Sequence, residues 1–173
     1  MPYIAKGTSR ANLRLIAEHI RKITGYENKP CFPIIKFLEH VMPVLFPQFN
    51  YEIVEDAELP GMEGLTLPHK NLILLPNSVY EDAVAGKGRA RFSVTHEVAH
   101  LIIIDDGNTA LARTENMVAY QDPEWQANAL ASEILLPPRL TAGMGQDEIT
   151  EKFGVSYAAA NVHIKQKFKE NLP

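Results

Sequence analysis

Apolar residues recur at helical spacing in two segments near the N-terminus. In residues 10–24 they predict an amphipathic helix, on Leu13, Ile16, Ala17, Ile20 and Ile23, with Gly25 as its C-terminal cap. A second helix is predicted from Pro33 to Val44, on Ile34, Phe37, Leu38 and Val41. Pro33 suits a first helical turn, because its missing N–H needs no partner there. Pro43 and Pro47 should end this helix near Val44.

The middle of the chain changes to short apolar runs that are typical of strands. Residues 51–55 form one candidate strand and are followed by a turn-rich stretch. Residues 64–67 and 72–75 form two more, separated by Pro68-His69-Lys70-Asn71, and predict a hairpin or two adjacent strands. From Ser78 onward the pattern is helical almost to the end, with breaks near residues 86–88, 105–108 and 137–138.

This order of elements predicts an α+β fold, in which a small β-sheet is packed beside several helices. We expect a single domain over residues 1–173. Its N-terminal helices would occupy residues 1–48, the sheet would lie within 50–137, and a C-terminal helical segment would follow at 138–173.

Composition excludes several classes of protein. The 173 residues are 46% hydrophobic and carry 17 basic and 21 acidic side chains, for a net charge of −4. These values exclude wholesale disorder, and the acidic balance argues against nucleic acid as the default partner. No apolar run could span a bilayer, and the N-terminus lacks signal-peptide features, so we expect a cytoplasmic protein without membrane contact. Cys31 is the only cysteine, which excludes an intramolecular disulfide and a Cys-rich zinc cluster; we expect it to be a buried or half-buried apolar residue.

Residues 89–104, RARFSVTHEVAHLIII, carry the arrangement H-E-x-x-H on a predicted helix. His96 and His100 are four residues apart and share one helix face, so both imidazoles can bind one tetrahedral metal ion. Glu97 would lie beside the ion and could take a proton from water. The alternative is a core helix with two histidines at this spacing by coincidence. Because the surrounding helix is apolar, burying His96 and Glu97 without partners would be costly, which favours the metal site.

A catalytic zinc usually has three protein ligands and a water, so a third ligand is needed. Residues 122–138 predict a helix with Asp122 as N-cap and Glu124 in its first turn. Asn128 lies on the same face as Glu124, where its side-chain oxygen could accept from a ligand histidine. Spacing alone leaves open that Glu124 only complements the helix dipole. Glu133 is the rival ligand and Glu115 is also possible, whereas Asp105 and Asp106 follow the first helix too closely to swing back easily.

Several blocks together resemble the ImmA/IrrE family of metallo-endopeptidases. They are GKGRARFSVTHEVAHLI, PEWQANALASEILLP, the strand-rich stretch before them, and the tail ITEKFGVSYAAANVHIKQ. The resemblance covers about residues 50–170. It implies a zincin-like active-site helix and a gluzincin-like centre with one Zn²⁺ per chain. In that centre His96, His100 and Glu124 are the ligands and Glu97 is the general base.

The resemblance also implies a substrate, because relatives cleave or inactivate helix–turn–helix repressors of the XRE type. The sequence departs from the family pattern at Ala99, where a glycine is common, and at Pro137-Pro138, where Met-Pro is common. The competing interpretation is a non-enzymatic regulator, of the phage-switch or toxin–antitoxin type. Such a protein would bind a repressor or DNA and hold a purely structural metal.

The C-terminal segment predicts a helix at residues 146–153, a tight turn, and a helix that begins after Ser156. This helix-turn-helix-like segment is expected to be a structural hairpin whose lysines (Lys165, Lys167 and Lys169) face solvent, with repressor docking as the next interpretation and DNA binding last. A peptidase also needs a donor for the developing oxyanion. The candidates are Tyr120, Tyr157 and His163, and the sequence does not choose among them.

Overall fold

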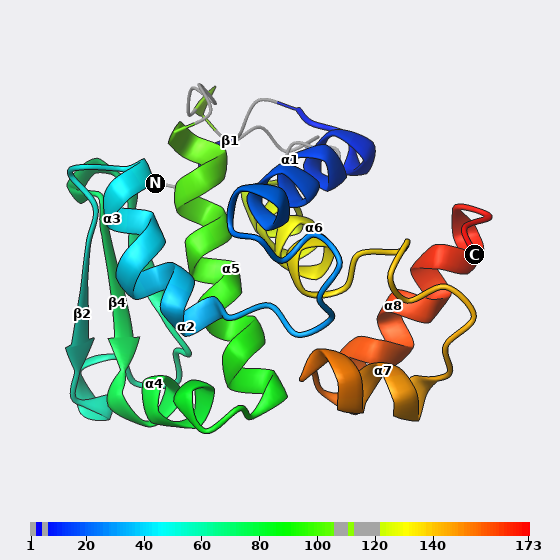
Figure 1. Ribbon diagram of the computed structural model, residues 1–173. Helices are drawn as coiled ribbons and strands as arrows, with labels where there is room; N and C mark the ends of the chain where they lie inside the picture. Colours follow the sequence, from blue (N-terminus) through cyan, green and yellow to red (C-terminus); the bar gives the residue numbers. More distant parts are fainter. Residues whose placement is uncertain (1–2, 5–6, 106–110, 113–121) are drawn as a thin grey trace.

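Three helices form the centre of the chain: α1 (Arg10–Ile23), α5 (Gly88–Asp105) and α6 (Pro123–Leu135). In the computed structural model, α6 packs against both α1 and α5 (Figure 1). The structure describes residues 3–4, 7–105, 111–112 and 122–173. The sheet lies on one side of these helices and the C-terminal helices lie on the other, so the architecture is α+β, as predicted.

The sheet has three short strands, β2 (Asn50–Val54), β3 (Leu65–Leu67) and β4 (Leu72–Pro76), in the order β2-β4-β3. β3 and β4 are antiparallel, with Thr66 opposite Ile73, which confirms the two adjacent strands that the sequence predicted. β2 runs parallel to β4, a pairing that the sequence did not predict. β3 is therefore an edge strand, and it contacts α5. A second, two-stranded sheet pairs β1 (Tyr3–Ile4) with β5 (Leu111–Ala112).

The helix predicted from Pro33 to Val44 ends at Leu45, close to its expected end, but it is irregular before Pro43. The segment consists of α2 (Ile34–Lys36), a π-helical turn over Phe37–Val41, and α3 (Met42–Leu45). Pro43 lies in the first turn of α3, where a missing N–H is tolerated. A π-helical turn, which is wider than an α-helical one, precedes it. The helix therefore continues although Pro43 has no backbone N–H to donate.

The core is formed mainly by apolar residues of the central helices and of β4. Small residues line the contact between α5 and α6, where Ala99, Ala127 and Ala131 are fully buried and allow the two helices to approach closely. Cys31 is exposed, so the expectation of a buried cysteine is wrong; its neighbour Phe32 fills the core position instead. None of the described helices has the length and apolar content needed to cross a bilayer.

The C-terminal segment forms the predicted helix–turn–helix-like pair, α7 (Gln146–Phe153) and α8 (Tyr157–Lys169). Gly154 makes the turn with φ of 63°, and the Ser156 side chain caps α8 by accepting from the Ala159 N–H. Lys167 is buried and donates to the carbonyl of Thr141 at 2.9 Å, so the expectation of a solvated lysine is wrong at this position. Lys165 and Lys169 are exposed, as expected.

A short loop joins α4 (Asn77–Val84) to α5. The start of α5 is packed tightly against the turn between α7 and α8. A Cβ on Gly88 would lie 2.3 Å from the carbonyl carbon of Val155, so no side chain fits there. Arg91 is buried and donates to the carbonyls of Gly154 and Phe32, each at 2.9 Å. These contacts hold the C-terminal pair against the helix that carries H-E-x-x-H.

Candidate metal centre

The two histidines of H-E-x-x-H point their Nε2 atoms toward the same point beside α5. Because Val94, Val98 and Leu101 are buried, the helix is held in one rotation about its axis, which leaves His96 and His100 at the edge of the core. Their Nε2 atoms are 3.0 Å apart, and their side chains are 15% and 10% exposed.

Glu124 reaches the same point from the first turn of α6. Asp122 caps this helix by accepting from the Glu124 N–H at 3.0 Å, which fixes where α6 begins. The Glu124 carboxylate lies 3.0 Å from Nε2 of His96 and 2.9 Å from Nε2 of His100. Among the described residues, this is the one group of three potential metal ligands whose donor atoms lie within 4.8 Å of one another.

These three side chains interact with one another through hydrogen bonds and charge. Hydrogen bonds to His100 and His96 hold the pKa of the Glu124 carboxyl far below its ordinary value. Burial alone would lower the pKa of His96, but the hydrogen bond to Glu124 and the carboxylates of Glu97 and Glu124 outweigh it, so this pKa is raised. Two imidazoles and one carboxylate are ligands that zinc prefers, and Glu124 is 67% exposed, which leaves an open side for water or substrate. The residues therefore fit a catalytic zinc.

Glu97 is held next to this group by the edge strand β3. Its side chain is only 9% exposed, and its Oε2 accepts from the hydroxyl of Thr66 at 2.6 Å. The Thr66 hydroxyl also lies 2.9 Å from the Glu97 carbonyl oxygen. A Cβ on Gly64 would lie 2.6 Å from Cγ of Glu97, so only glycine leaves room for this carboxylate. The sequence analysis missed both Thr66 and Gly64.

A cavity of about 250 Å³ opens onto the three candidate ligands and Glu97. The rest of its wall comes from the end of the loop before β3 and from β3 itself: Met62, Gly64, Leu65 and Thr66. A second cavity adjoins it and is lined by His96 and Asn128. Interaction with the Asn128 side chain is one of the causes that raise the pKa of His96. Among the described residues, however, Nδ1 of His96 has no hydrogen-bond partner of good geometry.

Other residues that the sequence analysis considered lie elsewhere. Glu133, the rival ligand, is buried near the C-terminal end of α6 and binds Arg10 and Arg14 at 2.8 and 2.9 Å. His163 is also buried, with its Nε2 2.8 Å from the Thr141 hydroxyl, and it lines a different cavity. Tyr157 is 58% exposed and lines none of the cavities described here. Asp106, Glu115 and Tyr120 lie outside the described residues.

Known proteins match this chain both in sequence family and in fold. A family model described as the IrrE N-terminal-like domain, Peptidase M78, matches residues 66–165, a range that includes all three candidate ligands and Glu97. A solved structure titled "Mycobacterium tuberculosis transcriptional regulator" is similar in fold, with a TM-score of 0.58 at 16% sequence identity. The match covers 86% of this chain and 45% of that one, so this chain spans less than half of the regulator's length. No curated protein matches the sequence significantly.

Proposed function

This chain belongs to the Peptidase M78 family, which is defined by the IrrE N-terminal-like domain, and we propose that it is a zinc-dependent endopeptidase. The observation that carries this proposal is the convergence of His96, His100 and Glu124, with their donor atoms about 3 Å apart. These three side chains would hold one Zn²⁺ per chain. When bound, the zinc would lower the pKa of a water molecule to about 7 and polarise a peptide carbonyl.

Glu97 is the general base in this proposal. Its carboxylate would remove a proton from the attacking water and then transfer that proton to the leaving amine nitrogen as the peptide bond breaks. The hydroxyl of Thr66 and the space left by Gly64 hold the carboxylate in one place, which keeps it oriented toward the cavity of the three ligands. Asn128 would support His96 from the adjoining cavity.

The proposed substrate is a helix–turn–helix repressor of the XRE type, which the chain would cleave or inactivate. Membership of the family supports a regulatory role of this kind, and the similar solved structure is itself titled a transcriptional regulator. A formal charge of −4 gives the chain no electrostatic preference for DNA, so we propose that it acts on the repressor protein and not on its operator.

The test compares the wild-type chain with Glu97→Gln. We expect about one zinc per chain in both proteins by mass spectrometry. Only the wild type should cleave members of a panel of purified XRE-type repressors, as followed by intact-mass analysis. The matched control is Glu151→Gln, which changes an exposed carboxylate on α7 that lines none of the cavities described here. Cleavage by Glu97→Gln at the wild-type rate would overturn the assigned base, and an equal effect of both proteins on a repressor that remains intact would indicate binding without catalysis.

A further inference from the structure

A separate cavity of about 490 Å³ lies between the central helices and α8. Its walls are mostly apolar, and small residues on α6 and α8 leave the space that the cavity occupies. The side chains that form these walls are Phe92, Trp125, Ala129, Leu136, Ala159 and Val162. Apolar cavities of this size with a few polar groups at their edges are typical ligand sites.

This cavity adjoins the proposed metal centre and shares part of its lining with it. Phe92, Ser93 and Asn128 line both the 490 Å³ cavity and the cavity that contains His96, Glu97 and Glu124. Trp125 follows Glu124 directly on α6 and faces the larger cavity. A peptide with one of its bonds at the metal centre therefore has the larger cavity within reach of a neighbouring side chain.

The charged groups around the cavity are already paired within the protein. Arg10 donates to Glu133 at 2.8 Å, and Arg89 donates to Glu63 at 2.6 Å. His163 lies 2.8 Å from the Thr141 hydroxyl, and burial, together with the nearby cations, lowers its pKa to about 4, so it is neutral near pH 7. Because the partly buried Arg10 is already engaged by Glu133, a charged side chain in the inner part of the cavity would lose its hydration without gaining a counter-ion there. An apolar side chain would gain from burial.

We infer that this cavity binds a bulky apolar or aromatic side chain of the substrate beside the scissile bond, and so determines which peptide bonds are cleaved. The inference rests on the proposed function, because the metal centre supplies the bond to be cut. It adds a role for the C-terminal pair of helices, since Ala159 and Val162 of α8 form one wall of the site.

The test needs a readout of the cavity that does not depend on catalysis. We would titrate N-acetyl-phenylalaninamide, N-acetyl-glycinamide and N-acetyl-glutamate amide into the zinc-free 173-residue chain and follow the backbone amide chemical shifts of Ala129, Ala159 and Gln166. In parallel, the zinc-loaded protein would be profiled on a peptide library by mass spectrometry. We expect the phenylalanine probe alone to shift these amides, and cleavage sites to be enriched in bulky apolar residues on one side of the cut bond.

Val162→Trp is the matching variant, because Val162 lines the cavity yet is 64% exposed, so a larger side chain can narrow the cavity without entering the core. We expect this variant to bind the phenylalanine probe at least about tenfold more weakly. Its cleavage sites in the peptide library should shift toward small residues. Val84→Trp is the control, since Val84 is exposed on α4 away from the cavity, and it should change neither result.

The outcomes separate the two proposals. No binding of the phenylalanine probe, equal binding of the glutamate probe, or an unchanged profile in Val162→Trp would overturn the inference even if peptides are cut. Binding of the probe without cleavage of any peptide or repressor would support the cavity as a side-chain site but overturn the endopeptidase that it was inferred to serve.

Discussion

The two ends of α6 place a glutamate in opposite surroundings. Glu124, in the first turn, is 67% exposed and lies among imidazoles, which exchange protons near neutral pH and bind metals. Glu133, near the other end, is 2% exposed and lies between Arg10 and Arg14 of α1, whose charges are permanent. One carboxylate is available for chemistry, while the other joins α1 to α6.

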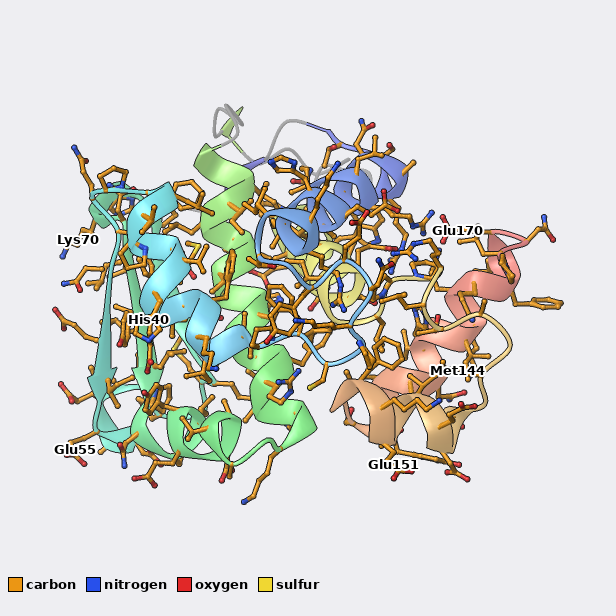
Figure 2. All side chains as sticks on the ribbon, in the orientation of Figure 1. His40, Glu55, Lys70, Met144, Glu151 and Glu170 are labelled. Atoms are coloured by element: carbon orange, nitrogen blue, oxygen red, sulfur yellow. The ribbon has the colours of Figure 1, made fainter. Side chains whose placement is uncertain are left out.

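Glu170, at the end of α8, adds a third segment to the ion-pair network that Glu133 forms with Arg10 and Arg14. It follows α8 directly and accepts from Arg14 at 3.0 Å, and Figure 2 labels it at the C-terminal end of α8, on the side nearest α1. Arg14 thus contacts carboxylates from two different segments. We conclude that the difference between Glu124 and Glu133 is set by their partners and burial, since both belong to the same helix.

The largest expected effect is on zinc content, which should depend on Glu124 and not on Glu133. Glu124→Ala removes one of the three proposed ligands, so zinc should fall from about one per chain to almost none after dialysis, and cleavage should be lost. Its unfolding free energy in the presence of chelator should change little, because Glu124 is largely exposed. Mass spectrometry and urea denaturation measure both quantities, and full zinc occupancy in the variant would exclude Glu124 as a ligand.

Glu133→Ala should show the reverse pattern. Removing the carboxylate leaves the partly buried guanidinium groups of Arg10 and Arg14 with Glu170 as their remaining counter-ion. Breaking a buried ion pair typically costs about 3–5 kcal/mol, so we expect a loss of unfolding free energy near the lower end of that range. Urea denaturation with chelator present would measure this loss. Glu148→Ala is the control, because Glu148 pairs with Lys152 on the exposed face of α7, and its loss should cost no more than about 0.5 kcal/mol. Zinc content of folded Glu133→Ala should stay close to wild type; its loss would contradict the separation of the two ends.

A smaller effect should appear in the pH dependence of stability at the Glu133 end. Burial, followed by Lys167, Arg10 and Arg14, lowers the pKa of His163 from 6.5 to about 4, with Glu170 opposing. Between these values the unfolded chain binds a proton that the folded chain does not, so folding stability is complete above about pH 6.5 and falls as the pH drops toward 4. The loss amounts to about 2–3 kcal/mol.

His163→Gln should remove this part of the acid loss while keeping a polar group near Thr141. The measurement is the unfolding free energy of zinc-free wild type and variant from pH 7 down to 4. His19→Gln, at an exposed histidine, should follow the wild-type curve. A pH dependence that is the same in all three proteins would show that His163 does not carry the effect.

The parts of the site that could be predicted from the sequence are local in the chain. His96, Glu97 and His100 belong to one helical turn, so helix periodicity alone sets their relative positions. Asp122 marks the start of α6 and so places Glu124 in its first turn, although choosing Glu124 over Glu133 required the family resemblance. The sequence contains no signal that Arg10 and Arg14, more than 100 residues earlier, would engage Glu133.

The parts that could not be predicted depend on register between distant segments. The contact of Thr66 with Glu97 joins residues 31 positions apart, and it exists only because β3 lies at the sheet edge beside α5. The parallel pairing of β2 with β4 has the same character. Near Pro43 the end of the helix could be predicted, but the π-helical turn over Phe37–Val41 that accommodates the missing hydrogen bond could not.

Trp125 is the only tryptophan of the chain, and it lines the cavity directly after Glu124. The tryptophan emission of the protein, excited at wavelengths that tyrosine does not absorb, therefore comes from one indole between the proposed metal centre and the 490 Å³ cavity. Filling the cavity removes water from around the ring and should shift this emission toward the blue. Stopped-flow recording of that single signal can time the arrival of metal and of ligand separately, without any attached dye.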